Sequence, residues 1–472
     1  MSETIKFILN GDLREISGLP PETTVLQYLR TRERLTGTKE GCAEGDCGAC
    51  TVIMGEVENG EIVYKAVNAC LMLLPVLDGR SLMTVEHLKM NPVQRALAEG
   101  HGSQCGFCTP GFVMSLSALF HEKEDADDED IRGSVAGNLC RCTGYRPILD
   151  AARRANASPE RHLGGDSSAL KKLQREKMFS YACGGKFFSP RTVEELALAL
   201  DACPEAVILS GGTDVGLRVT KQHLRLGTIV YTGNVKALRD IRKTPEGLEI
   251  GAAVSYGRAF DFLASYDESM GELLRRIGST QIRNLGTVAG NIANGSPVGD
   301  GMPPLIALGA KITLRSKKGT RELALEDYFI SYKKQDRNPG EFIEKITVPS
   351  KPDNVLFKVY KISKRFDQDI SAVCGAFALS LDGKTVTNAR IAFGGMASMP
   401  KRAQKTEKFL IGKTWTEETA RQAGEILKED FSPLTDVRAC ADYRRQVSAN
   451  LLRRFYIETT EGGTRVYGYE GA

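Results

Sequence analysis

The N-terminal part of the chain alternates between apolar and polar positions in short runs, and these runs predict strands packed against one helix. Residues 3–16 alternate, and Asn10-Gly11 interrupts the alternation where a tight hairpin turn fits. Residues 24–30 are predicted to form a short helix, and residues 51–54 and 62–67 are predicted to form further strands. Short strands around a single helix indicate a small α+β domain, which we expect over residues 1–88.

A helical pattern replaces the alternation at Asn91. This residue suits the cap of a helix that has Pro92 at its first position and Gly100 beyond its end. Thr109-Pro110 repeats the cap-and-proline start, and apolar residues follow at helical spacing. Further along lie an acidic segment that we interpret as solvated (122–130) and another helix (147–155). Together these features predict a helical domain over residues 89–155.

The rest of the chain is punctuated by glycine and proline. Residues 156–178 favour an interdomain linker, and Thr192 with Glu195 forms a possible capping box before a helix rich in Ala and Leu. Later patterns predict a β-rich region over about 206–349, strands over 357–362 and 389–394, and a helix over 417–429. We therefore expect two further domains and a tail, at residues 179–350, 351–460 and 461–472.

Composition adds little until the cysteines are considered. The 472 residues are 42% hydrophobic and 26% charged, which excludes a disordered, collagenous or membrane-spanning chain. The net charge of +4 offers no electrostatic reason to expect nucleic acid. The N-terminus lacks the apolar core of a secretory signal, so we expect a cytoplasmic protein whose 12 cysteines are reduced. Clustered thiols in that compartment indicate metal binding or redox chemistry.

The first cysteine set is Cys42, Cys47, Cys50 and Cys70. Its spacing, C-x4-C-x2-C with a distant fourth cysteine, is typical of a plant-type 2Fe-2S cluster. Three glycines in the ligand loop (Gly41, Gly45 and Gly48) are expected to allow positive φ and to let amide groups approach sulfur. Four thiolates also suit structural zinc, although zinc sites more often pair two short C-x2-C units.

The second cysteine set is Cys105, Cys108, Cys140 and Cys142. It joins a C-x2-C pair to a C-x-C pair, each just outside a predicted helix, so helical hairpins can bring the pairs together. By itself this spacing leaves zinc as an alternative. Its position after a ferredoxin-type domain favours a second 2Fe-2S cluster. The other cysteines are interpreted as small buried residues without ligand roles (Cys183, Cys203, Cys374 and Cys440).

Two glycine-rich segments follow the linker. Residues 207–216 form an apolar run that opens into Gly211-Gly212, where exposed amides suit a diphosphate. Taken alone, this segment favours an ordinary tight turn. Residues 287–300 combine small side chains, which leave room for a flat ligand, with polar groups such as Asn291 and Asp300. The pattern is not G-x-G-x-x-G, so it does not predict a Rossmann domain.

Two longer motifs carry a resemblance to a known family. Residues 102–111 (GSQCGFCTPG) and 137–145 (GNLCRCTGY) resemble the cluster-binding blocks of the xanthine oxidase family of molybdenum hydroxylases. The family fold implies a multidomain α+β chain: a β-grasp 2Fe-2S ferredoxin domain, a helical 2Fe-2S domain, a vanillyl-alcohol-oxidase-like FAD domain and a C-terminal α+β flavoprotein domain. Residues 357–361 and 365–374 resemble that last domain, including its loop near the flavin ring.

The same resemblance implies individual cofactor contacts. Gln104 matches a glutamine that contacts the molybdopterin of a partner, and Asn294 stands where other members have threonine. The residues that match FAD-binding positions are Ile208, Leu209, Ser210, Gly211, Gly212, Thr213, Asp214, Val215, Ile277, Thr287, Gly290, Asn291, Asn294, Asp300, Ile343 and Lys361. Without the resemblance, Lys361 would be interpreted as a surface lysine.

The function implied by the resemblance is electron transfer. Electrons from a molybdenum cofactor would pass through the helical cluster and the plant-type cluster to FAD, and then to NAD+, during oxidation of hypoxanthine and xanthine to urate. The chain has no room for molybdopterin-binding domains, so we expect a large partner subunit that carries them, in a heterotetramer or larger assembly. No catalytic residue toward the purine is expected in this chain, and neither nucleic acid nor membrane is expected as a partner.

Two alternatives stay open at this stage. The alternative within the family is the corresponding subunit of another molybdenum hydroxylase, acting on an aldehyde or an N-heterocycle, and only the substrate pocket of the partner would separate it from the favoured function. A non-enzymatic iron–sulfur redox sensor with a degenerate flavin domain is the alternative from a different functional class, and FAD content separates it from the others.

Overall fold

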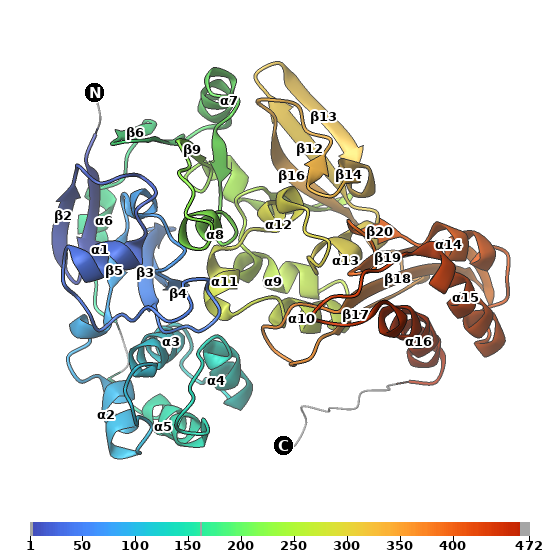
Figure 1. Cartoon of the computed structure of the whole chain (residues 1–472), viewed down its shortest axis with the longest axis horizontal. Coiled ribbons are helices and arrows are strands. Elements are labelled where there is room, and N and C mark those ends of the chain that lie inside the picture. Colours follow the sequence, from blue (N-terminus) through green and yellow to red (C-terminus); the bar gives the residue numbers. More distant parts are fainter. Residues whose placement is uncertain (1–2, 161–162, 463–472) are drawn as a thin grey trace. The chain divides into compact units, whose positions relative to one another are not determined.

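The computed structural model of the chain describes residues 3–160 and 163–462. It divides into two compact units (Figure 1). The first unit contains the described residues up to 239, with 255–258 and 278–287; the second contains 240–254, 259–277 and the described residues from 288 onwards. The fold is the multidomain α+β architecture that the sequence predicts. The five segment boundaries given above stay predictions, and most of the predicted tail lies outside the described residues.

A five-stranded sheet opens the first unit, in the order β2-β1-β5-β3-β4. Its elements are β1 (Ile5–Leu9), β2 (Asp12–Ile16), α1 (Val25–Thr31), β3 (Thr51–Glu58), β4 (Glu61–Asn68) and β5 (Ser81–Met83). The predicted hairpin turn is present, with φ of 53° at Asn10 and 95° at Gly11. Thr24 caps α1 reciprocally with Gln27, as a capping box requires. Local signals therefore account for this sheet and its helix.

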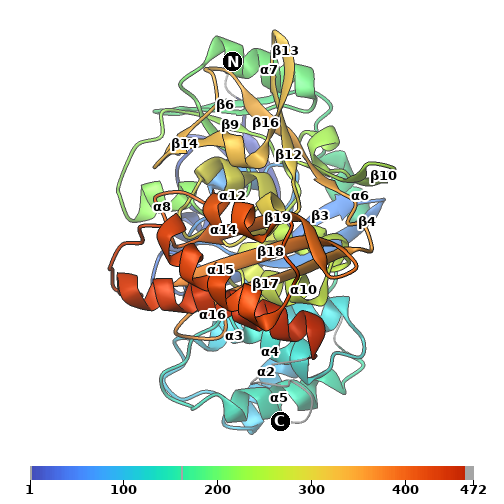
Figure 2. The same ribbon diagram turned by 90° about the vertical axis from the view of Figure 1, so that its right-hand side faces the viewer.

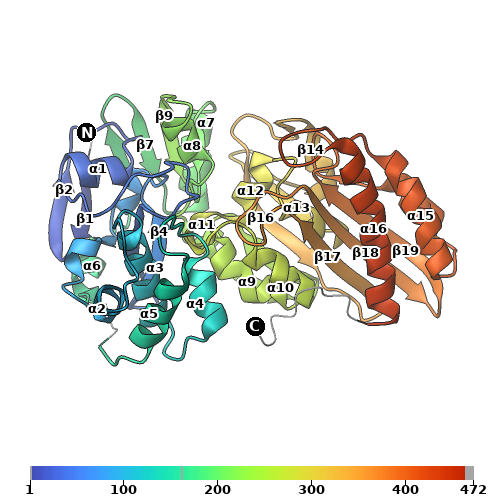
Figure 3. The ribbon, with the colours of Figure 1, turned by 60° about the horizontal axis from the view of Figure 1, so that its bottom comes forward.

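Four helices follow, and they lie together next to β3 and β4 (Figure 3). They are α2 (Pro92–Glu99), α3 (Thr109–Glu122), α4 (Asp128–Val135) and α5 (Arg146–Asn156). Asn91 caps α2 as predicted, but the predicted cap at Thr109 is wrong by one residue, since Cys108 occupies that position. The Thr109 hydroxyl lies 2.7 Å from that of Ser103.

The rest of the first unit contains a four-stranded sheet in the order β6-β7-β9-β8. Its elements are α6 (Ser167–Lys172), β6 (Phe179–Ala182), β7 (Lys186–Ser189), α7 (Val193–Ala202), β8 (Val207–Leu209), α8 (Val215–Thr220), β9 (Thr228–Tyr231) and α11 (Thr280–Leu285). Only half of the predicted capping box forms at α7, because the Glu195 carboxylate accepts from the Arg191 N–H at 2.7 Å. Helix α6 lies within the segment that was predicted to be a linker.

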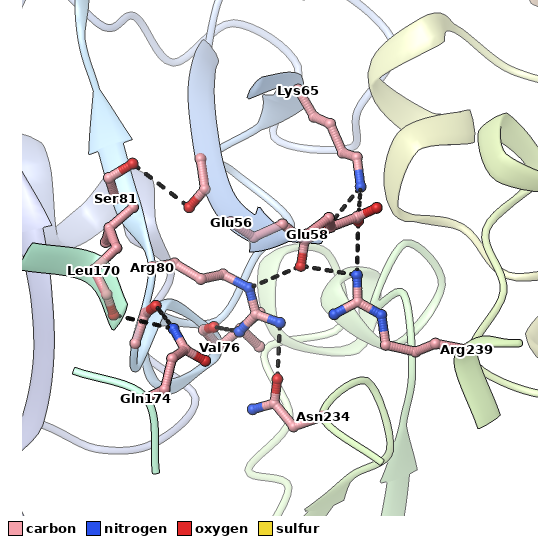
Figure 4. A network of polar contacts seen from close by, with 12 residues as sticks. Glu56, Glu58, Lys65, Val76, Arg80, Ser81, Leu170, Gln174, Asn234 and Arg239 are labelled. Carbon is pink, nitrogen blue, oxygen red and sulfur yellow. Dashed lines mark hydrogen bonds and ion pairs between the residues drawn. The ribbon is translucent and has the colours of Figure 1, made fainter. Parts of the chain in front are cut away.

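An ion network connects the two sheets of the first unit (Figure 4). Glu56 of β3 pairs with Lys65 of β4 at 2.7 Å and with Arg239 at 3.1 Å. The buried Arg80 donates to Asn234 at 2.9 Å and lies 3.7 Å from the Glu56 carboxylate. Side chains from β3, β4 and the segment after β9 therefore neutralise one another where the sheets meet.

The second unit begins with an antiparallel sheet in the order β10-β11-β16-β12-β13. The strands in this part are β10 (Ile241–Thr244), β11 (Gly247–Gly251), β12 (Lys311–Ser316), β13 (Gly319–Ala324), β14 (Phe329–Ser331), β15 (Lys334–Gln335) and β16 (Phe342–Pro349). The helices are α9 (Tyr256–Ala264, whose first turn belongs to the first unit), α10 (Glu268–Arg275), α12 (Val288–Asn294) and α13 (Met302–Ala307). The β-rich description of this region was therefore incomplete, because short helices of small and apolar residues show little periodicity.

A second antiparallel sheet, in the order β17-β18-β19-β20, completes this unit. Its elements are β17 (Val355–Ile362), β18 (Val373–Asp382), β19 (Thr385–Gly394), β20 (Lys401–Arg402), α14 (Gln404–Leu410), α15 (Glu417–Asp430) and α16 (Ala441–Thr460). The helices cover one face of the sheet (Figure 2), and Trp415 and Phe455 lie in the apolar core between them. No helix in the described part of the chain is both long and apolar enough to cross a membrane.

Candidate functional site

The loop that carries Cys42 and Cys47 folds around their sulfur atoms. The Sγ of Cys42 accepts from the backbone N–H of Glu44 at 3.4 Å and from those of Asp46 and Cys47 at 3.3 Å. The Cys42 N–H in turn donates to the Cys47 Sγ at 3.3 Å. Backbone amides directed at sulfur are the environment that stabilises an anionic thiolate cluster.

The glycines of this loop act in two different ways. Gly45 and Gly48 have positive φ as predicted, at 85° and 68°. Gly41 does not, so the prediction of positive φ there is wrong; a Cβ at Gly41 would lie 2.7 Å from the Cys47 Sγ, and the residue supplies space instead. Ala43 adopts φ of 54°, which the sequence did not indicate.

Strand pairing brings the distant Cys70 to Cys50. Strands β3 and β4 are antiparallel with Thr51 opposite Asn68, so the cysteines just outside the two strands lie side by side. Both side chains are buried, and Asn68 Nδ2 lies 3.7 Å from the Cys50 Sγ. The separation of these two cysteines along the chain is therefore the length of one hairpin.

The four thiols of this first set interact as two pairs. The pKa of the Cys42 thiol is lowered to about 5, first by its hydrogen bond with Cys47 and, against the effect of burial, by the loop amides. The pKa of Cys47 is raised, first by the same hydrogen bond and then by burial. The pKa of Cys50 is lowered by its hydrogen bond with Cys70, whose own pKa is raised. One sulfur of each pair thus favours the thiolate, the form that binds metal.

The second set also forms pairs, at the ends of the helical hairpins. The hydrogen bond with Cys105 raises the pKa of Cys142. Burial and then the hydrogen bond with Cys140 raise the pKa of Cys108 to about 12. Cys140 also lies 3.1 Å from the Thr143 hydroxyl and donates its N–H to the Tyr145 hydroxyl at 3.0 Å. Cys105 and Cys142 are exposed, as is Gln104 beside them.

This pairing fits a two-iron cluster, in which each iron takes two thiolates. Among the described residues, no group of three or more His, Cys, Asp or Glu side chains converges as the ligands of a single metal ion. A 2Fe-2S cluster would be held by Cys42, Cys47, Cys50 and Cys70, and a second by Cys105, Cys108, Cys140 and Cys142. Of the remaining cysteines, Cys374 is buried, but Cys440 is exposed at the N-terminus of α16, which corrects the expectation of a buried residue.

Ile208 to Val215, which resemble a flavin-binding segment, form the turn between β8 and α8. A Cβ at Gly211 would overlap the Leu285 carbonyl, and Gly212 has φ of 77°, so both positions require glycine. The Ser210 hydroxyl is buried without a hydrogen-bond partner among the described residues, and burial raises the pKa of Asp214. A buried hydroxyl of this kind at a tight turn fits a polar ligand such as a diphosphate. Thr287, also in the first unit, follows α11.

The remaining predicted flavin contacts belong to the second unit, and two of them form a buried ion pair. Lys361 of β17 contacts the Asp300 carboxylate, and the two side chains are only 2% and 7% exposed. The Ser371 hydroxyl donates to the other oxygen of Asp300 at 2.6 Å. The interpretation of Lys361 as a surface lysine is therefore wrong. Other members of the predicted set lie on α12 (Gly290, Asn291 and Asn294), at the end of α10 (Ile277) and on β16 (Ile343).

Sequence reasoning did not single out Gln281, whose side chain lies between the two cysteine loops. It is completely buried on α11 and approaches residues that are far away in the sequence. The only local signal was a polar residue two positions after the Ser279 helix cap, which is too common to indicate a role.

Four family models match successive parts of the chain. They are the 2Fe-2S iron-sulfur cluster binding domain (residues 7–74), the 2Fe-2S binding domain (84–153), the FAD binding domain in molybdopterin dehydrogenase (178–351) and the CO dehydrogenase flavoprotein C-terminal domain (358–459). Both cysteine sets and the flavin segments fall within these matches.

Two fungal proteins are similar over almost the whole chain. Xanthine dehydrogenase of Blastobotrys adeninivorans is 31% identical over 97% of this chain and 41% of its own length. Xanthine dehydrogenase of Emericella nidulans is 32% identical over 96% of this chain and 38% of its own length. The chain therefore spans about two fifths of the length of these relatives.

Solved structures share part of the fold. A Cu,Mo-CO dehydrogenase chain is 26% identical, with a TM-score of 0.53 over 57% of this chain and 94% of that one. A chain of quinoline 2-oxidoreductase from Pseudomonas putida 86, at 24% identity, has a TM-score of 0.54 over 58% of this chain and 96% of that one. With two cluster-binding domains, a molybdopterin-dehydrogenase FAD domain and the two fungal relatives, the chain belongs to the xanthine oxidase family of molybdenum hydroxylases.

Proposed function

We propose that the chain is the electron-transfer subunit of a xanthine dehydrogenase. A large molybdopterin-binding subunit would oxidise hypoxanthine and xanthine to urate, and this chain would deliver the electrons to NAD+. The similarity to xanthine dehydrogenases over 97% of the chain supports this assignment. We further propose a heterotetramer or larger assembly in the cytoplasm, where reducing conditions keep the thiols available.

The observation that carries the proposal is the different burial of two neighbouring cysteine sets. Cys105 and Cys142 are exposed, whereas Cys50 and Cys70 are buried. The Leu139 N–H, next to Cys140, donates to the Cys47 carbonyl at 3.0 Å, so the two sets are in contact. An exposed set suits exchange with a partner protein, and a buried set suits transfer within the chain.

The apolar core around the buried set leads toward the glycine turn. Cys50 and Cys70 belong to the same buried cluster as Leu209, the last residue of β8 before that turn. Clusters bound to the two sets would carry electrons singly, and FAD would collect two of them for hydride transfer to NAD+. The chain's own residues bring the two cysteine loops into contact and exclude water from Cys50 and Cys70.

Cofactor analysis of the purified chain tests this proposal. We expect about four irons and one FAD per chain, as two 2Fe-2S clusters and a flavin require. The native protein should co-purify with a larger, molybdenum-containing chain and reduce NAD+ with xanthine. Zinc in place of half of the iron would contradict the second cluster, and iron without FAD would favour a redox sensor.

A second candidate is the same subunit of a different molybdenum hydroxylase. The match of residues 358–459 to the CO dehydrogenase flavoprotein C-terminal domain favours keeping it, because that match does not distinguish substrates. An assembly that oxidises an aldehyde or an N-heterocycle, and leaves xanthine unchanged, would replace the first candidate by the second.

A further inference from the structure

The buried amide of Gln281 lies between elements that carry the two cysteine loops. Its Nε2 is 3.0 Å from the Ser115 hydroxyl of α3, 3.1 Å from the Asn138 Oδ1 and 3.1 Å from the Thr51 hydroxyl of β3. Gln281 is 0% exposed and belongs to α11, within the segment that matches the FAD-binding domain. One side chain of the flavin domain thus contacts both cluster domains.

The partners of Gln281 contact the cysteine loops directly. Asn138 Nδ2 and the Thr51 hydroxyl both donate to the Gly48 carbonyl, at 3.1 Å and 2.6 Å. Gly48 follows Cys47, and Asn138 lies two residues before Cys140. The Ser115 hydroxyl completes the network by donating to the Asn138 Oδ1 at 2.8 Å. Each cysteine loop is therefore one hydrogen bond away from a side chain that Gln281 contacts.

The contact between the loops leaves no room for side chains. A Cβ at Gly48 would overlap the Gly137 carbonyl, and a Cβ at Gly111 would overlap the Gly48 carbonyl. A Cβ at Gly137 would in turn overlap the Gln281 Oε1. Because the backbones approach so closely, apolar side chains cannot fix their separation here, and the buried hydrogen bonds take that role.

We propose that Gln281 is a positioning residue for electron transfer between the two cysteine sets. Its amide orients Asn138, Ser115 and Thr51, and thereby holds the Leu139 N–H on the Cys47 carbonyl. This inference rests on the proposed electron-transfer function and deepens it. Electron transfer between fixed centres falls steeply with their separation, so a small relaxation of this contact slows transfer without removing a ligand.

The test compares variants of the full chain loaded with iron and FAD. Gln281→Glu keeps the side-chain size but directs a carboxylate at groups that now accept from the amide, and Ser115→Ala removes one partner with less disturbance. Both should retain the wild-type iron and FAD content. Reduction by NADH of the cluster bound to the second cysteine set should slow about tenfold in Gln281→Glu. This is the lower end of the effects seen for groups that orient metal ligands.

Two further readouts separate positioning from general stability. The magnetic interaction between the two reduced clusters, measured by electron paramagnetic resonance, should change in both variants, and hydrogen exchange at the Leu139 amide should accelerate. Gln422→Leu is the matched control, because Gln422 is exposed on α15 and donates to Glu418 at 2.7 Å. This control should behave like the wild type in each measurement.

The outcomes distinguish this inference from the proposed function. A wild-type chain that binds two clusters and FAD, with variants that match its cluster interaction and transfer rate, would overturn the role of Gln281 alone. Iron loss from both variants would also overturn it, since the network would then serve cluster retention. A wild-type chain without the second cluster would instead refute the electron-transfer function on which the inference rests.

Discussion

At the scale of single residues, Lys361 and Asp300 show that the structural role of a charged side chain depends on its burial. Each would be ordinary at a surface, but together they form an ion pair that is almost inaccessible to water. The Lys361 ammonium also donates to the Asp369 carbonyl at 2.7 Å, and Ser371 donates to Asp300, so both charges are satisfied. Removing one partner leaves the other charged and buried, which is costly.

Lys361→Met should therefore destabilise the second unit by about 3–5 kcal/mol, the usual range for breaking a buried pair. Trp415 is the only tryptophan of the chain and lies in the core of this unit, so its fluorescence during denaturation reports the change. Lys311→Met is the control, because its pair with Glu322 is about half exposed and should contribute less than about 1 kcal/mol. Equal unfolding midpoints for the two variants would contradict this prediction.

At the scale of elements, the β3–β4 hairpin has two separate effects. Its register places Cys50 beside Cys70 at one end, and it brings Lys65 to Glu56 further along. Burial opposes the charge of Glu56, but Lys65, Arg80 and Arg239 outweigh it and hold the pKa of this carboxyl below its ordinary value of 4.5. The same hairpin thus contributes to a cluster site and to the ion network between the sheets.

Acid should weaken this network. Because the folded pKa of Glu56 is lowered, its stabilising effect is complete above the unfolded pKa and is lost as the pH falls below about 4.5. Glu56→Gln should be less stable than the wild type at pH 7, and the difference should shrink as the pH falls through this range. Thermal unfolding followed by circular dichroism measures this. Glu61→Gln, at an exposed position of β4, should show no such trend. A stability difference between the wild type and Glu56→Gln that stays constant with pH would argue against the network.

At the scale of the whole molecule, the order of the electron path follows from which cysteine set is exposed. The second cysteine set has two exposed members, Cys105 and Cys142. In the first set, Cys50 and Cys70 share their apolar core with β8, the strand that leads to the glycine turn. The proposed path therefore has an entry that depends on the helical domain and an exit that does not.

Cys140→Ser should separate these two halves in the assembled enzyme. We expect NADH-to-dye electron transfer to stay near the wild-type rate, because it needs only the flavin and the cluster of the first cysteine set. Substrate-driven NAD+ reduction should fall at least about tenfold, since the electrons must pass through the second cysteine set, which has lost one ligand. Iron and FAD analysis of the variant is the control for folding. Parallel loss of both activities in a chain that retains FAD would contradict the proposed order of electron transfer.

Features that depend on adjacent residues could be predicted from the sequence alone. The cap at Asn91, the Asn10-Gly11 turn and the positive φ of Gly45 and Gly48 were predicted, because each needs only a few neighbouring residues. The cysteine spacings and the two longer motifs were sufficient to indicate the family. The short helices between β11 and β12 were not predictable in this way, since they have too few turns to establish a period.

Contacts between residues that are distant in the sequence became visible only in the folded chain. Lys361 reaches Asp300 across 61 positions and Gln281 reaches Thr51 across 230, and no local pattern encodes either contact. The cap of α3 was misplaced by one residue, and the Thr109 hydroxyl meets that of Ser103, six residues earlier. Burial gives such polar contacts their strength, and burial is a property of the folded chain: the cysteine spacing predicted two clusters, and the fold placed their loops one hydrogen bond apart.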